Sequence, residues 1–187
     1  FSSDLVFDGA KGAPYVEGDA TAPLNVYGMS KTLAERLVAD RDPNAVIART
    51  SAFFGPWDQS NFVHRALSDL QSGRPFHALS DVVVSPTYVP DLADATLTLL
   101  VDGATGLWHL ASAGAMTWSE LARRAAEMAR ISTEQLVACH AGELVAPARR
   151  PAYCALSSER GALLPSLENA LERFVTQWSA HALARAG

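Results

Sequence analysis

Cysteine and histidine are scarce in this chain, and neither falls in a metal-ligand spacing. The 187 residues include two cysteines, Cys139 and Cys154, and five histidines. The cysteines form no Cys-x-x-Cys pair, and no two histidines stand in a His-x-x-x-His spacing. The sequence therefore predicts two reduced thiols, no disulfide framework and no metal site.

Long apolar runs and an excess of positive charge are also missing. No run approaches the ~18 apolar residues that cross a bilayer, and the first residues do not follow a signal-peptide pattern. Fifteen basic side chains stand against 20 acidic ones, for a net charge of -5, and the basic residues are scattered. A nucleic-acid-binding surface instead gathers Lys and Arg on one face. We expect a soluble, cytoplasmic protein that binds neither nucleic acid nor membrane.

A third absence is the glycine-rich turn that binds a dinucleotide. In folds that have it, glycines between the first strand and helix let the backbone approach the pyrophosphate. The pairs Gly9/Gly12 and Gly103/Gly106 lack a third glycine and are typical of simple turns. The chain opens at Phe1 in what reads as the end of a strand, so we expect an N-terminal part with this turn to precede it.

What is present is the patterning of an α/β domain. At 49% hydrophobic residues, the chain can bury the core of one domain, or of one domain with a small lobe. A continuous apolar run over 45–50 predicts a strand covered on both faces in a parallel sheet. Apolar periodicity predicts helices over 25–40, 61–72 and 89–101. A capping box predicts a further helix that begins near Trp118.

In the first of these helices, the apolar side chains predict which face is buried. Leu33, Leu37 and Val38 form a stripe that we expect to pack inward. Glu35 lies off this stripe, and we expect it to face water.

The most informative short stretch is Tyr27-Gly28-Met29-Ser30-Lys31 at the head of that helix. Tyr27 and Lys31 are four residues apart, so they project from one helix face and can share a small site. An ammonium group beside a phenol stabilises the phenolate and makes the phenol a better proton donor. Ser3, at a predicted strand end, can supply a third group at the carboxyl edge of the sheet. Alone, this spacing is more typical of a surface pair than of a catalytic site.

An ordered series of motifs surrounds this pair and extends along most of the chain. It comprises residues 1–9, 14–19, 23–31, 49–51, 54–56, 61–62, 86–88, 91–95 and 150–151. The series resembles the extended short-chain dehydrogenase/reductases, and within them the dTDP-4-dehydrorhamnose reductase family. The resemblance implies an α/β fold in which residues 1–187 are the C-terminal, catalytic and substrate-binding portion of a Rossmann-like three-layer sandwich with a small α/β substrate-binding lobe.

The resemblance also implies a reaction, the reduction of a 4-keto sugar nucleotide by NADPH or NADH in the full-length protein. The roles that it implies are as follows: catalytic, Ser3, Asp4, Tyr27 and Lys31; cofactor-binding, Tyr27, Lys31 and Arg49; substrate-binding, Ser51, Ala52, Asn61, Thr87 and Arg150. Tyr27 would protonate the ketone oxygen, Lys31 would also bind the nicotinamide ribose, and Ser3 would hold the carbonyl oxygen. For Ser3, capping of a backbone amide is the alternative role.

The chain departs from the family pattern at two places. Ala52 replaces the aromatic residue that usually follows Arg-Thr-Ser, so we expect one side of the sugar ring to lose its apolar wall. A polar stretch is replaced by the valines at 82–84. These departures leave open a non-catalytic regulatory or binding module, and a sugar-nucleotide epimerase or dehydratase. The sequence also leaves open a homodimer and a fusion to another enzyme domain before this portion.

Overall fold

The computed structural model of the protein describes residues 1–143, 148–161 and 164–186, with side chains described as far as residue 180. Its main sheet has three parallel strands in the order β1 (Ser2–Ser3), β2 (Val46–Thr50) and β7 (Gly106–His109). The central strand is the one that the apolar run predicted. Because β1 and β2 are parallel, both of their carboxyl ends reach the same edge of the sheet.

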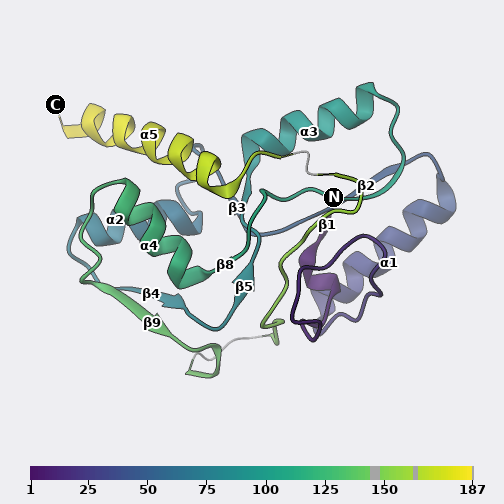
Figure 1. The fold of residues 1–187 in the computed structure, drawn as a ribbon, viewed down its shortest axis with the longest axis horizontal. Helices are drawn as coiled ribbons and strands as arrows, with labels where there is room; N and C mark the ends of the chain where they lie inside the picture. Colours follow the sequence, from purple (N-terminus) through teal and green to yellow (C-terminus); the bar gives the residue numbers. More distant parts are fainter. Residues whose placement is uncertain (144–147, 162–163, 187) are drawn as a thin grey trace.

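Two helices flank this sheet on opposite sides, as Figure 1 shows: α1 (Val26–Arg41) and α3 (Val89–Val101). Neighbouring residues of β2 point to the two sides. Ala48 packs in a buried apolar cluster with residues of α3, whereas Arg49 is ion-paired to Glu35 of α1. A short 3-10 helix, η1 (Asp4–Val6), follows β1 directly and packs against α1. The arrangement confirms the predicted α/β fold with a parallel sheet.

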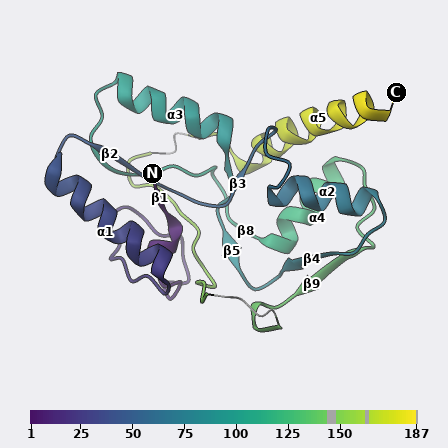
Figure 2. The same cartoon turned by 180° about the vertical axis from the view of Figure 1, so that it is seen from behind.

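The remaining elements form a second group, which we call the small lobe (Figure 2). Its helices are α2 (Phe62–Gln71), α4 (Trp118–Met128) and α5 (Leu167–Ala186). Its strands are β3 (Phe53–Phe54) parallel to β6 (Thr87–Tyr88), β4 (Phe76–Leu79) parallel to β9 (Leu136–Cys139), and β5 (Val83–Val84) antiparallel to β8 (Met116–Thr117). The 3-10 helix η2 (Ala141–Glu143) follows β9.

The small lobe has its own apolar core, built where α2, α4 and α5 meet. Leu67, Leu121, Leu171 and Phe174 are almost completely buried there. The predicted capping box is present at the start of α4. The Thr117 hydroxyl accepts from the Glu120 amide at 3.2 Å, and the Glu120 carboxylate accepts from the Thr117 amide at 2.8 Å.

The predicted inward face of α1 is wrong. Leu33 and Leu37 are 57% and 59% exposed, and Val38 is also exposed. The buried residues of α1 are Gly28 and Thr32, and the Glu35 side chain lies against Arg49 instead of facing water. A buried arginine on β2 needs an anionic partner, and this requirement together with the close packing at Gly28 decides which face of α1 meets the sheet.

Candidate active site

A pocket of about 540 Å³ lies where the carboxyl ends of β1 and β2 meet the small lobe. The main sheet, η1 and the start of α1, with the residues next to them, contribute Ser2, Ser3, Asp4, Leu5, Asn25, Tyr27, Thr50, Ser51 and Ala52. The small lobe and the segment around Arg150 contribute Phe53, Val82, Val84, Trp118, Ala148, Arg150, Pro151 and Cys154. The pocket therefore gathers six residues of the predicted site: Ser3, Asp4, Tyr27, Ser51, Ala52 and Arg150.

A cluster of hydroxyl groups around one carboxylate forms the floor of this pocket at the strand ends. Ser3 Oγ donates to Asp4 Oδ1 at 2.8 Å, and Ser51 Oγ donates to Asp4 Oδ2 at 2.6 Å. All three residues are buried. Ser3 Oγ also accepts from the Leu5 amide at 3.1 Å, so it caps η1, as the alternative role predicted. Ser3 can donate to a ligand only if its hydroxyl rotates away from Asp4.

Tyr27 and Lys31 lie one turn apart at the start of α1, as their spacing predicted. The ammonium nitrogen of Lys31 is 5.7 Å from the centre of the Tyr27 ring, and it donates to the carbonyl of Phe1 at 3.2 Å. The Tyr27 side chain lines the pocket and is about half exposed. A phenol with solvent access on one side and a cation on the other is suited to proton transfer.

Asn25 fixes the position of this first turn. Its side-chain oxygen accepts from the Gly28 amide at 2.8 Å and caps α1. Its side-chain nitrogen donates to the carbonyl of Arg149 at 2.9 Å, on the residue before Arg150. The start of the helix is thus joined to the segment that carries the predicted substrate-binding arginine. Arg150 itself is exposed and lines the pocket.

Arg49, predicted to bind cofactor, is buried beneath the sheet edge. Its guanidinium donates to both carboxylate oxygens of Glu35, at 2.8 and 2.7 Å, and lies 5.0 Å from the centre of the Phe7 ring. Ser2 donates to the same carboxylate. Arg49 does not appear among the residues that line the pocket. Its observed contacts serve the packing of α1 on the sheet, and cofactor binding by Arg49 stays a prediction.

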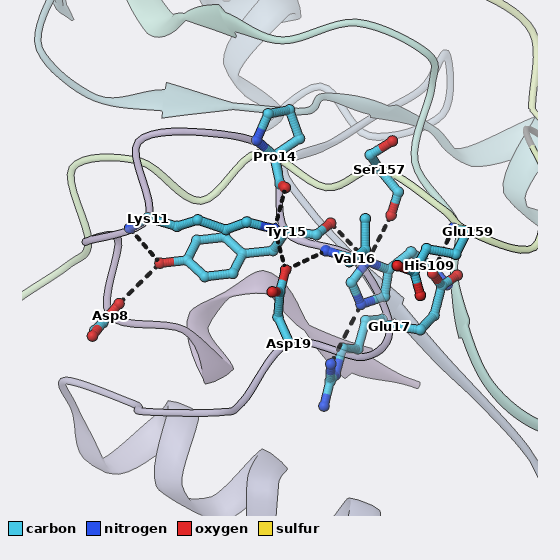
Figure 3. A network of polar contacts seen from close by, with 11 residues as sticks. Asp8, Lys11, Pro14, Tyr15, Val16, Glu17, Asp19, His109, Ser157 and Glu159 are labelled. Atoms are coloured by element: carbon cyan, nitrogen blue, oxygen red, sulfur yellow. Dashed lines mark hydrogen bonds and ion pairs between the residues drawn. The ribbon is translucent and has the colours of Figure 1, made fainter.

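The buried ring of His109 continues this polar network (Figure 3). Arg49 Nη1 lies 3.4 Å from His109 Nε2, and His109 Nδ1 lies 2.8 Å from the carbonyl of Ser157. Because a guanidinium only donates, Nε2 accepts and the ring is neutral with its proton on Nδ1. Burial lowers the pKa of His109 and favours this neutral form. The His109 amide also donates to Glu17 at 2.9 Å.

Two other predicted substrate residues, Asn61 and Thr87, are not among the described residues that line the pocket, and both have structural partners. Asn61 caps α2 by accepting from the His64 amide at 2.9 Å, and it donates to the carbonyl of Gly55 at 2.9 Å. Thr87 is fully buried and accepts from the Thr50 hydroxyl at 3.3 Å. Their roles in substrate binding stay predictions.

The sequence analysis missed Trp118 and Cys154, which both line the pocket. Trp118 was noticed only as part of a capping box, and its distance along the chain from Tyr27 gave no local signal. Cys154 is buried beside Asp4, and burial together with that negative charge raises the pKa of its thiol. Cys154 is therefore a neutral thiol, and neither it nor Cys139 forms a disulfide.

Over residues 1–143, 148–161 and 164–186, no three His, Cys, Asp or Glu side chains group in a way that could hold a metal ion. In the same ranges, no helix has both the length and the apolar character needed to cross a membrane.

The parallel sheet, its flanking helices and the pocket at the strand ends define a Rossmann-like α/β protein. A family model described as the RmlD substrate binding domain matches residues 1–179, and the chain belongs to this family.

Relatives with established names agree with this assignment. A dTDP-4-dehydrorhamnose reductase from Sinorhizobium fredii is 33% identical over 189 residues, with 93% of this chain and 64% of the relative covered. One from Mycolicibacterium smegmatis is 34% identical, with 86% and 50% covered. The crystal structure of a Bacillus anthracis dTDP-4-dehydrorhamnose reductase in complex with NADP has a TM-score of 0.87 and 30% identity, with 94% and 64% covered. The chain thus spans half to two thirds of the length of these proteins.

Proposed function

We propose that residues 1–187 form the catalytic and substrate-binding portion of a reductase that acts on a 4-keto sugar nucleotide, of the dTDP-4-dehydrorhamnose type, with NADPH. The observation that carries the proposal is the single pocket that gathers Ser3, Asp4, Tyr27 and Arg150. Its volume of about 540 Å³ lies within the range of small-molecule sites, roughly 300–1,000 Å³. The cation of Arg150 in the pocket lining suits a diphosphate, which arginine binds through a planar pair of donors.

Tyr27 and Lys31, near the start of α1, fit the nicotinamide half of the cofactor. NADPH, when bound, supplies the hydride. The Lys31 ammonium has three donors, of which one reaches the Phe1 carbonyl, and the others suit the hydroxyl groups of a ribose. Tyr27 stands beside this ammonium and lines the pocket. NADP in the Bacillus anthracis relative is consistent with this assignment.

Tyr27 is the proton donor in this proposal. As the ketone carbon accepts hydride, negative charge develops on its oxygen, and the Tyr27 hydroxyl delivers the proton to that oxygen. The neighbouring Lys31 ammonium stabilises the phenolate that remains. Ser3, after rotation away from Asp4, donates to the same oxygen and orients it, while Asp4 stays held by Ser51.

The test is Tyr27→Phe in the full-length protein, which removes the proton and keeps the ring. We expect kcat to fall by about 10²- to 10⁴-fold, the usual size of general acid catalysis, with little change in cofactor affinity. Tyr153→Phe is the matched control, because Tyr153 is not one of the described residues that line the pocket. The kcat of this variant should be unchanged. A Tyr27→Phe enzyme that keeps more than about a third of wild-type turnover is not using Tyr27 as its acid.

Analysis of products separates this proposal from its rivals. A reductase consumes one NADPH for each ketone that it reduces. Conversion of the sugar nucleotide with no net consumption of NADPH identifies an epimerase or a dehydratase instead. Stable binding of a partner protein with no turnover of any 4-keto sugar nucleotide identifies a non-catalytic module.

A further inference from the structure

The pocket contains an aromatic side chain close to the position where Ala52 leaves a gap. Ala52 and Trp118 both pack against one buried apolar cluster, formed by Val82, Val84 and Cys154. Both also line the pocket. Ala52, between β2 and β3, contributes a methyl group, and Trp118, at the start of α4, contributes an indole. Trp118 therefore supplies an aromatic surface on the side of the pocket where Ala52 stands in place of an aromatic residue.

The indole of Trp118 is held rigidly by its surroundings. Trp118 is the first residue of α4, directly after the capping residue Thr117, so the backbone that carries it is fixed by the capping box. The Phe62 ring packs against the indole, with ring centres 4.6 Å apart and an angle of 57° between their planes. The side chain is only partly buried, which leaves part of it open to the pocket. A pre-positioned aromatic surface binds a ligand with little loss of side-chain freedom.

The other aromatic residues in the described pocket lining are less suited to this position. Tyr27 stands beside Lys31 on α1, where it is the proposed proton donor. Phe53 is 53% exposed and is not part of the cluster that Ala52 contacts. Trp118 alone of the three shares that cluster with Ala52.

We propose that Trp118 is the apolar wall against which the sugar ring of the substrate packs, in place of the aromatic side chain that Ala52 replaces. This inference rests on the proposed function, since it assumes a sugar nucleotide in the pocket. The C–H groups on one face of a hexose are apolar, and the face of an indole is the aromatic surface best able to cover them. The polar edge of the sugar then remains directed to Ser3, Asp4 and Tyr27. Trp118 is thus a specificity-determining residue.

The experiment compares Trp118→Leu with the wild type in the full-length protein by calorimetry. The two ligands are a dTDP-linked 6-deoxyhexose and dTDP alone, which lacks the sugar. Loss of the wall should weaken binding of the sugar nucleotide by about 10-fold and change the affinity for dTDP by less than about 2-fold. Trp57→Leu is the matched control, because Trp57 is 76% exposed and lies outside the pocket lining, and both affinities should stay at the wild-type value.

The other outcomes have distinct meanings. Equal weakening of dTDP and the sugar nucleotide makes Trp118 a platform for the base and overturns the proposal, as does unchanged binding of both. A wild type that binds neither ligand overturns the proposed function, and this inference with it. Trp118→Phe keeps an aromatic ring and should restore binding to within about 3-fold of wild type, which distinguishes loss of the wall from loss of folding.

A second pair of variants tests the replacement directly. Tryptophans at positions 52 and 118 would compete for the same wall, so Ala52→Trp should weaken sugar-nucleotide binding when Trp118 is present. In a Trp118→Ala background, the same change should tighten binding by about 3-fold or more relative to Trp118→Ala alone. Ala52 has a φ of +43°, and the backbone strain of a larger residue there is common to both backgrounds. Equal effects of Ala52→Trp in the two backgrounds contradict the shared wall.

Discussion

Gly28 is the point at which the catalytic helix rests on the sheet edge. A Cβ atom added at Gly28 would overlap the carbonyl oxygen of Leu5 and would come within 2.9 Å of the Pro23 side chain. The Leu5 carbonyl belongs to η1, the turn that directly follows Ser3. The obstacle is backbone and cannot turn aside, so in Gly28→Ala the helix itself must retreat by about 1 Å to restore ordinary contact.

Two opposing effects set the stability of this variant. Overpacking of a close contact costs about 1–3 kcal/mol, whereas alanine in place of glycine stabilises a helix by up to ~1 kcal/mol. We expect the overpacking to dominate, with a net loss of ~1–2 kcal/mol. The same retreat moves Tyr27 and Lys31 away from Ser3 and Asp4. A displacement of about 1 Å in a catalytic site can cost on the order of 10²-fold in rate.

Thermal unfolding of this chain and kcat of the full-length protein provide the two measurements. Gly28→Ala should show a lower Tm and a kcat reduced by about 10²-fold, with a smaller change in KM. Gly142→Ala is the control, because its added Cβ meets no atom within 4 Å, and both quantities should remain unchanged. A Gly28→Ala protein that is more stable than wild type and fully active would refute the close packing of α1 against the Leu5 carbonyl.

Two further predictions concern buried polar groups. The Thr32 hydroxyl is buried and has no hydrogen-bond partner in the part of the chain that the structure describes. Thr32→Val should therefore raise the free energy of unfolding by ~1 kcal/mol, measured by chemical denaturation; a loss of stability would contradict this. Burial lowers the pKa of His109 in the folded state. As the pH falls from about 6.5 towards this lowered pKa, His109 therefore takes up a proton more readily in the unfolded state than in the folded state. The free energy of unfolding should decrease over that window, by less than ~1.4 kcal/mol per pH unit. His109→Gln should abolish this dependence of stability on pH. The separate loss of stability at lower pH that arises from Glu17 should remain. Burial raises the pKa of Glu17, but its hydrogen bonds to Ser158 and to backbone amides lower that pKa overall.

Features decided by neighbouring residues were predictable from the sequence. The capping box of Thr117 and Glu120 needs only residues three apart, and it is present. The helix predicted over 89–101 has the same bounds in the structure. The parallel strand was marked by its apolar run, and Tyr27 and Lys31 stand together because a helix places them so.

Features decided by contacts between distant residues were not predictable in this way. In the sequence, the spacing of Leu33 and Leu37 is that of a buried helix face, yet both side chains are exposed. Glu35 turns inward because it pairs with Arg49, which lies on a different element. Trp118 reaches the pocket through the packing of α4 against the strands, which no local pattern encodes.

The Arg49 and Glu35 pair also determines how the central strand is aligned with its neighbours. A parallel strand covered on both faces carries apolar residues on each side, so its hydrophobic pattern distinguishes poorly between one alignment and the next. A shift of β2 by one residue would turn Arg49 into the apolar cluster around Leu92 and place Ala48 opposite Glu35. Both charges would then be buried without a partner, at a cost of several kcal/mol. The ion pair thus selects a single strand register against its nearest competitors.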